Sequence, residues 1–252
     1  RWIHCIGAGI EHLLPLDWLP VNTVLTNNKG VHAKKAGEYG LMTVLMMHNH
    51  FPKIMTNQNN KFYKSIYGTP ISGQTIIILG TGNLGGTVAQ LLEPLGPKII
   101  GVNRNGKKVK GCTKIVTTNK LEEVLPKADI LYVALPETPE TIGIIDRYRL
   151  SLLKKSCGII NVGRQSAIDY QAICEMLETK KLAGAILDVF SPEPIDPNSH
   201  LWKVPNLIIS PHVSADDGDN YISQTLNLFF HNLENFISGK SFINIINKDL
   251  GY

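Results

Sequence analysis

Three polar residues of this chain could together bind an acid and transfer a proton. Arg164, Glu193 and His212 each come just after an apolar segment with the character of a buried strand. A guanidinium group can hold a carboxylate through two parallel hydrogen bonds and polarise the neighbouring carbonyl. A histidine can deliver a proton near neutral pH, and a carboxylate beside it favours the imidazolium form and fixes the ring. These side chains suit the reduction of a 2-oxo acid by hydride, which requires all three tasks.

Each of the three residues also has an ordinary structural explanation. The arginine could be solvated, the glutamate could be a loop carboxylate, and the histidine could be satisfied within its loop. In an open α/β sheet, however, ligands bind outside the carboxyl ends of the strands. Because all three residues are expected at that edge, we favour the functional interpretation.

A glycine loop is expected at the same edge. Residues 74–86 read QTIIILGTGNLGG, with Gly80, Gly82 and Gly85 at G-x-G-x-x-G spacing. The loop follows a predicted strand at 76–79 and precedes a predicted helix at 84–95. The first glycine permits the turn, the second lets the backbone approach a pyrophosphate, and the third lets the helix pack on the strand. With the strand at 98–102 this forms a βαβ unit, which favours dinucleotide binding over a merely structural turn.

The rest of the chain predicts the elements that position these residues. An alternation of strands and helices after the glycine loop is typical of a doubly wound parallel sheet. We expect one long helix over 31–58, kinked at Pro52, and a helix at 221–237 that packs on the amino-terminal part. The other predicted strands are 2–6, 21–26, 114–116, 130–134, 158–162, 185–189 and 207–210, and the other helices lie near 121–125, 146–153 and 169–179.

Composition excludes several classes of protein. A hydrophobic content of 43% and a charged content of 18% are those of an ordinary globular protein. The net charge is only +4, and no basic face is interleaved with aromatic residues, so we expect no nucleic-acid partner. The longest apolar run in the first half, 41–47, is too short to cross a membrane. The four cysteines (Cys5, Cys112, Cys157 and Cys174) lack metal-ligand spacing, and we expect buried free thiols in the cytoplasm and no metal site.

The motifs resemble those of the D-isomer-specific 2-hydroxyacid dehydrogenases, a family that includes glyoxylate/hydroxypyruvate reductases and phosphoglycerate dehydrogenase. The resemblance extends from Ile6 to the C-terminus, in the family's order. It is carried by IGAGIEH, TNNKGVHAKKAGE, GTGNLGG, ALPETPET, NVGRQSAID, GAILDVFSPEP, HLWKVPNLIISPHVSA and INIINKDLGY.

The resemblance implies roles for particular residues. Arg164 would bind substrate, and Glu193 would pair with His212, the acid/base. The backbone N–H groups at Ala8 and Gly9 would hold the substrate carboxylate. The implied cofactor-binding residues are Gly80, Gly82, Asn83, Leu84, Gly85, Asn103, Arg104, Asn105, Leu135, Pro136, Val162, Gly163, Asp188, His212 and Ala215. Of these, Asn83 and Leu84 would line the pyrophosphate, Leu135 and Pro136 the adenosine side, and Asp188 would meet the nicotinamide carboxamide.

The segment after the second strand of the βαβ unit predicts which nicotinamide is used. An NAD site usually has an acidic residue there, whereas residues 103–108 read NRNGKK and contain no carboxylate. Arg104 could stack on adenine and bind a 2′-phosphate, with Asn103 and Asn105 as donors. We therefore expect NADP(H) to be preferred, with NAD(H) possible. The alternative is a solvated basic turn.

The resemblance also implies a domain organisation. Residues 48–216 would form a Rossmann cofactor domain, and 1–47 with 217–252 a partial flavodoxin-like substrate domain that lacks its N-terminal part. We expect a homodimer through the methionine-rich helix 41–47, although a buried intramolecular helix would show the same pattern.

The expected function is NAD(P)H-dependent reduction of a small 2-oxo acid of the glyoxylate/hydroxypyruvate type to a D-2-hydroxy acid. The alternative is a nucleotide-responsive scaffold, because corepressors of the same family keep the same three residues. Two features depart from the family pattern. Gln165 replaces the usual glycine and could alter the substrate pocket, and Lys34 and Lys35 replace smaller or apolar residues.

Overall fold

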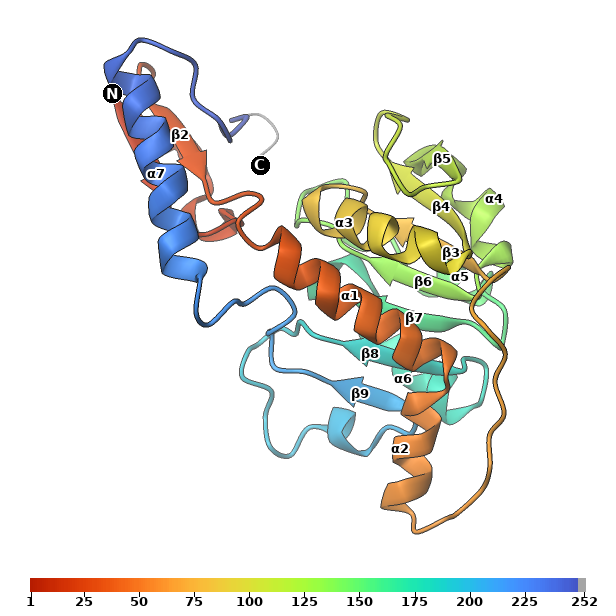
Figure 1. Ribbon diagram of the computed structural model, residues 1–252. Coiled ribbons are helices and arrows are strands. Elements are labelled where there is room, and N and C mark those ends of the chain that lie inside the picture. The colour runs from red at the N-terminus through yellow and green to blue at the C-terminus, as the bar shows by residue number, and fades with distance from the viewer. Residues whose placement is uncertain (249–252) are drawn as a thin grey trace. The chain divides into compact units, whose positions relative to one another are not determined.

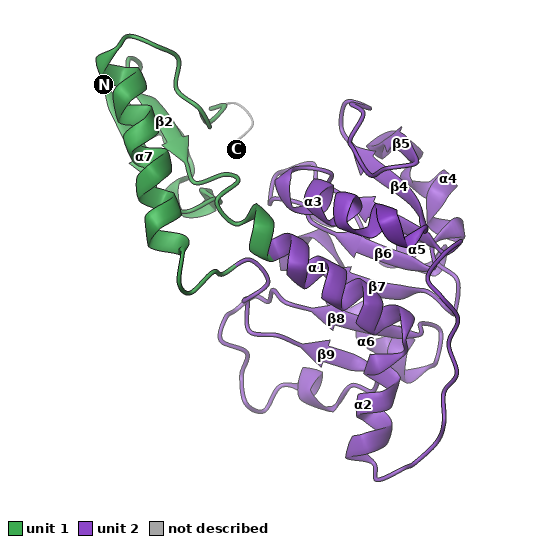
Figure 2. Ribbon diagram, in the orientation of Figure 1, with its two compact units in different colours: residues 1–35, 216–252 green, residues 36–215 purple. Residues whose placement is uncertain are grey.

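The computed structural model describes residues 1–248, so the last four residues of the terminal motif lie outside the described part. The chain divides into two compact units, shown in Figure 2. Unit 1 combines residues 1–35 with the segment that starts at Asp216, and unit 2 comprises residues 36–215. No helix within residues 1–248 has both the length and the apolar character needed to cross a membrane.

Unit 2 is built on a parallel sheet of seven strands, and it has the predicted doubly wound Rossmann fold. The order across the sheet is β5 (Lys114–Thr117), β4 (Lys98–Asn103), β3 (Thr75–Leu79), β6 (Ile130–Val133), β7 (Gly158–Asn161), β8 (Gly184–Leu187) and β9 (Leu207–Ile209). The chain winds outward from β3 in one direction and then from β6 in the other. Ligand sites in such sheets lie at this switch point, beyond the carboxyl ends of the strands.

Helices cover both faces of the sheet (Figure 1). One face carries α1 (Ala33–His48) and α3 (Asn83–Leu92), and the other carries α4 (Leu121–Val124), α5 (Arg147–Ser151) and α6 (Tyr170–Glu178). Successive residues of β3 alternate between the two cores: Ile76 and Ile78 pack in the first, and Ile77 and Leu79 in the second. All four are fully buried, which is why this strand is an unbroken apolar run.

The predicted single helix over 31–58 is wrong in one respect, because it consists of two helices. α1 ends at His48, and α2 runs over Phe51–Asn59. The chain turns at His50, whose φ of 60° is left-handed and cannot continue a helix. Pro52 lies in the first turn of α2, where a helix needs no N–H donor, so the proline begins a helix instead of bending one.

The division between the units also differs from the expected one. The contacts divide the chain after Lys35, within α1, whereas the sequence placed the boundary after Met47. The reason is that Val44 and Met47 are buried in the same core as the β3 residues Ile76 and Ile78. The cysteines are free, but Cys5 and Cys112 are only partly buried, unlike Cys157 and Cys174.

Unit 1 contains a parallel pair of strands, β1 (Trp2–Cys5) and β2 (Val24–Asn27), and the helix α7 (Tyr221–Ile237). Trp2 connects the three elements. Its ring stacks on Phe229 of α7 with centroids 5.1 Å apart, and its Nε1 donates to Thr26 Oγ1 of β2 at 2.8 Å. The prediction that the last helix packs on the amino-terminal part is confirmed.

Candidate active site

The glycine loop follows β3 and leads into α3, as its spacing predicts. Gly80 has a φ of 96°, and a Cβ there would lie 2.5 Å from the Ala134 carbonyl oxygen. At Gly85 a Cβ would lie 2.8 Å from Ile78 Cγ2 and closer still to the Gly80 carbonyl. Glycine is therefore required at both positions, by backbone conformation at the first and by helix packing at the second.

Gly82 differs from these two glycines because a Cβ there would meet nothing within 4 Å. Gly82 is also the N-cap of α3, and it makes no side-chain cap bond. The N-terminal N–H groups of α3, which include those of Asn83 and Leu84, therefore lie beside open space. An N-terminus of this kind binds phosphate through its N–H groups and its dipole. The loop therefore fits a dinucleotide pyrophosphate.

The end of β4 places Asn103, Arg104 and Asn105 beside the glycine loop. Asn103 Nδ2 donates to Thr81 Oγ1 and to the Lys107 carbonyl oxygen, both at 2.9 Å. This amide therefore ties the basic turn to the glycine loop and does not serve as a free phosphate donor. Asn105 Oδ1 accepts from the Lys107 N–H at 3.2 Å. Arg104 is exposed, so its guanidinium is accessible to a ligand.

The loops after β8 and β9 bring Glu193 and His212 together. His212 Nδ1 lies 2.8 Å from Glu193 Oε2, and both side chains are partly exposed. The backbone of His212 is left-handed, with a φ of 55°, and its N–H donates to the Asp188 carbonyl oxygen at 2.8 Å. The Glu193 contact occupies Nδ1 and leaves Nε2 as the ring nitrogen that can give a proton to a substrate.

Glu193 is held as a carboxylate at neutral pH. Partial burial disfavours its charge, but hydrogen bonds from His212 and from the Phe190 N–H, together with the positive charges of His212 and Arg164, outweigh burial and lower the pKa of Glu193. The bond from the Phe190 N–H to Glu193 Oε1 measures 2.6 Å. The carboxylate therefore has one oxygen fixed by the backbone and the other directed at the imidazole.

Arg164 follows β7 and is half-buried. Its Nη1 donates to the Gly163 carbonyl oxygen at 2.9 Å. The fully buried Asn161 supports this loop, because its Nδ2 donates to the Arg164 carbonyl oxygen at 3.0 Å and to Tyr170 Oη at 2.9 Å. This role of Asn161 was not predicted from the sequence, although Asn161 stands three residues before Arg164 in the stretch NVGR that carries the family resemblance. Gln165 opens a short 3-10 turn that ends at Ala167.

Asp188 has a different environment from the one expected for a nicotinamide contact. It is fully buried, and its Oδ1 accepts from Ser210 Oγ at 2.6 Å and from the Val213 N–H at 3.0 Å. Its Oδ2 accepts from the Ser214 N–H at 2.9 Å. Tyr39 Oη of α1 lies 2.5 Å from Ser210 Oγ. This network, which the sequence analysis did not foresee, fixes the segment that carries His212.

The other predicted site residues are distributed over both units. Leu135, Val162 and Gly163 are buried, and a Cβ on Gly163 would lie 2.5 Å from the Leu135 carbonyl oxygen, so the loops after β6 and β7 are in contact. Pro136 is exposed and Ala215 is partly buried.

The small-residue loop that holds Ala8 and Gly9 belongs to unit 1. The Ala8 carbonyl accepts from Asn27 Nδ2 at 2.6 Å. Within residues 1–248 the N–H groups of Ala8 and Gly9 have no protein acceptor, so they can donate to a ligand.

Comparisons with known proteins identify the family. Residues 41–214 match the family model "D-isomer specific 2-hydroxyacid dehydrogenase, NAD binding domain". A glyoxylate reductase from Aeropyrum pernix is 32% identical over 183 residues, which cover 73% of this chain and 54% of that protein. A glyoxylate/hydroxypyruvate reductase A from Enterobacter sp. is 28% identical over 261 residues, which cover 99% of this chain and 81% of that protein.

Solved structures agree with this match. An NADPH-dependent glyoxylate/hydroxypyruvate reductase from Sinorhizobium meliloti, in complex with NADP and sulfate, has a TM-score of 0.89 at 27% identity, covering 100% of this chain and 80% of that one. A D-isomer specific 2-hydroxyacid dehydrogenase from Xanthobacter autotrophicus, in complex with NADPH and MES, has a TM-score of 0.91 at 26% identity. The match covers 100% of this chain and 79% of that one. The chain therefore belongs to the D-isomer specific 2-hydroxyacid dehydrogenase family and is an NAD(P)-dependent enzyme of that family.

Proposed function

We propose that this enzyme reduces a small 2-oxo acid of the glyoxylate/hydroxypyruvate type to the D-2-hydroxy acid and prefers NADPH. The observation that carries the proposal is the contact of 2.8 Å between His212 and Glu193, at the sheet edge that also bears Arg164 and the glycine loop. The names of the relatives from Aeropyrum pernix, Enterobacter and Sinorhizobium meliloti support the substrate class.

The proposed roles follow from the chemistry of each side chain. Arg164 in unit 2 binds the substrate carboxylate and polarises the adjacent carbonyl. In unit 1, the N–H groups of Ala8 and Gly9 are further donors suited to a carboxylate. His212 donates a proton from Nε2 to the carbonyl oxygen, and Glu193 stabilises its imidazolium form. The reduced nicotinamide supplies the hydride. Unit 2 holds the cofactor through Gly82, Asn83 and Leu84, with Asp188 keeping the His212 segment in place for the nicotinamide.

We expect Glu193→Gln to restrict activity to lower pH. The amide lacks the negative charge that the carboxylate holds 2.8 Å from His212 Nδ1, so it supports a positively charged proton donor less well. The alkaline limb of the pH profile of kcat/KM for 2-oxo acid reduction should therefore move downward. Glu175→Gln is a matched control, because Glu175 pairs with Arg147 on α5, outside this site. An alkaline limb that stays in place in Glu193→Gln would remove Glu193 from this role.

We expect kcat/KM to favour NADPH over NADH by at least about tenfold, since a charged hydrogen bond contributes about 1.5–3 kcal/mol. The exposed Arg104 would bind the 2′-phosphate, and residues 103–108 offer no carboxylate to a ribose hydroxyl. Arg104→Ala should lose most of this preference through a higher KM for NADPH, with the KM for NADH nearly unchanged. Equal or NADH-favouring values in the wild type would contradict the assignment.

We also propose a homodimer through α1 and a cytoplasmic location. α1 buries Thr43, Val44 and Met47 within unit 2, yet Met42 remains 47% exposed and Leu41 and Leu45 are only partly buried. A second copy could cover this apolar strip. Light scattering at micromolar concentration should give twice the mass of the chain, and Met42→Glu should shift the mass toward a monomer. A wild-type monomer would reject the dimer.

The free cysteines support the proposed cytoplasmic location.

A further inference from the structure

A cavity of about 440 Å³ lies in unit 2 at the edge of the sheet opposite the glycine loop. Its wall includes residues that come shortly before strands: Ala183 and Asn206 directly precede β8 and β9, and Lys155 lies three residues before the start of β7. The glycine loop and the catalytic candidates instead follow strands. Because all seven strands are parallel, the cavity is at the amino edge and the proposed active site at the carboxyl edge. The cavity is therefore a separate place in the fold, and its size is that of a small-molecule site.

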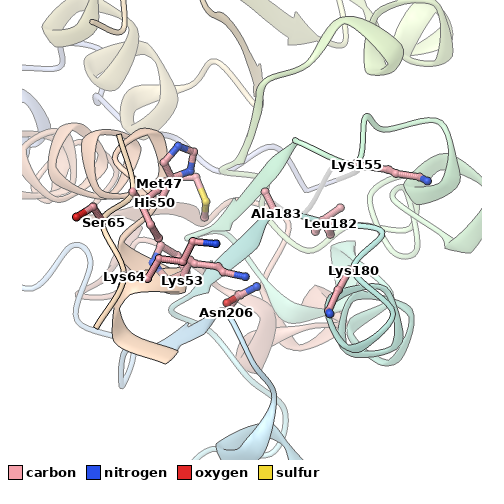
Figure 3. A pocket seen from close by; sticks show the side chains of 12 residues that line it. Met47, His50, Lys53, Lys64, Ser65, Lys155, Lys180, Leu182, Ala183 and Asn206 are labelled. Carbon is pink, nitrogen blue, oxygen red and sulfur yellow. The ribbon is translucent and has the colours of Figure 1, made fainter. Parts of the chain in front are cut away.

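The cavity is lined by positive charge. Four lysines line it together with His50: Lys53, Lys64, Lys155 and Lys180. Figure 3 shows the side chains of Lys53 and Lys64 pointing toward Asn206. Among the twelve lining residues there is no aspartate or glutamate to neutralise the lysines. Such a concentration of like charge in one hollow favours an anion, because each ammonium group repels the others until a counter-charge is bound.

The N-terminus of α2 adds donors to the same cavity. α2 starts after His50, and both His50 and Lys53 of its first turn line the wall. His50 is the N-cap and makes no side-chain cap bond. The first N–H groups of the helix are left without a side-chain acceptor there, and the positive end of the helix dipole is at the wall.

Asn206 provides an independent indication of a ligand. It lines the cavity, is only 9% exposed, and its Oδ1 is buried with no hydrogen-bond partner among the described residues. The backbone of Asn206 is fixed, because its N–H donates to Thr56 Oγ1 of α2 at 2.7 Å. A buried polar atom of this kind is costly unless a partner satisfies it. Since Oδ1 is an acceptor, the missing partner is a donor such as a hydroxyl group.

We propose that this cavity binds a small, hydroxyl-bearing phosphate ester. A phosphate group carries a charge of about −1.5 to −2 at neutral pH and several acceptor oxygens, which suits several lysines and a helix N-terminus better than a single carboxylate does. The lysines and the first turn of α2 bind the phosphate, and Asn206 Oδ1 accepts from a hydroxyl of the same molecule. The site is distinct from that of the nicotinamide nucleotide.

Calorimetric titration of the intact protein tests the proposal. The protein is first saturated with whichever of NADPH and NADH binds more tightly, so that the nucleotide's own phosphate subsites are filled. Fructose 1,6-bisphosphate is the probe, and fructose is its uncharged counterpart. We expect saturable binding of the bisphosphate, with a dissociation constant of about 1 mM or less, and no saturable binding of fructose.

Two double variants separate this cavity from general attraction to a basic protein. Lys53→Ala/Lys180→Ala should weaken bisphosphate binding at least about tenfold, because two charged contacts are lost. Lys127→Ala/Lys181→Ala removes the same charge from exposed lysines outside the cavity and should change binding less than about twofold. All four side chains are exposed, so neither variant disturbs the core.

Asn206→Gly tests the hydroxyl contact, because glycine tolerates the left-handed φ of 57° at this position. It should weaken binding of the bisphosphate more than binding of inorganic phosphate. The proposal is overturned if the wild type shows no saturable binding of the bisphosphate up to about 10 mM. Equal weakening in the two lysine double variants, or equal effects of Asn206→Gly on the two phosphates, would overturn it as well.

Discussion

Replacing His212 by alanine is expected to lower kcat at least about 100-fold, the usual scale for the loss of a general acid. The dissociation constant for NADPH should remain nearly unchanged, because the glycine loop and the turn after β4 lie on other strands. The side chain of His212 is 49% exposed, so its removal leaves no cavity in the core. The readouts are kcat at saturating substrate and a fluorescence titration with NADPH.

The backbone of His212 calls for a second variant. Its φ of 55° is left-handed, and alanine is strained there, whereas asparagine adopts this conformation readily. His212→Asn therefore removes the proton donor without straining the loop, and the same loss of kcat is expected. Near-full turnover in His212→Asn would show that the proton comes from another group.

Replacing Arg164 by alanine is expected to lower kcat/KM for the 2-oxo acid by about 100-fold or more. The variant loses the charged, bidentate contact to the substrate carboxylate, and with it the polarisation of the substrate carbonyl by the guanidinium group. The KM for NADPH should hardly change. Arg164→Lys should restore only part of the activity, since an ammonium group keeps the charge but not the planar fork.

A matched control for Arg164 is Arg147→Ala. Arg147 is 57% exposed and pairs with Glu175 on the helical layer of unit 2. Its loss should leave kcat/KM within about threefold of the wild type, because an exposed ion pair contributes at most about 1 kcal/mol to stability, too little to disturb the fold. A comparable loss of activity in Arg147→Ala and Arg164→Ala would mean that the effect of Arg164 is not specific to substrate.

The features that the sequence predicts well are those determined by residues that are close together in the chain. The apolar run before Gly80 is typical of a buried parallel strand, and the spacing of Gly80, Gly82 and Gly85 predicts the turn and the helix after it. Arg164 and His212 could be placed because parallel strands bring their carboxyl ends to one edge. The pairing of His212 with Glu193 was suggested by the chemistry of the two side chains and implied by the family resemblance, but no local sequence pattern places them in contact.

The features that the sequence does not predict depend on contacts between distant residues. The hydrogen bonds from Tyr39 to Ser210 and from Ser210 to Asp188 connect α1 with the ends of two strands, and no local pattern encodes them. The break at His50 was missed because the proline two residues later is the stronger local signal. Likewise, the basic cavity collects lysines from four separate segments, so only the folded chain reveals it.

The most direct test of the proposed function is the oxidation of NADPH in the presence of hydroxypyruvate, with chiral analysis of the product. We expect NADPH to be consumed in step with substrate, the product to be the D-isomer of the 2-hydroxy acid, and glyoxylate to be reduced as well. Saturable binding of NADPH without any oxidation by hydroxypyruvate, glyoxylate or other small 2-oxo acids would contradict it.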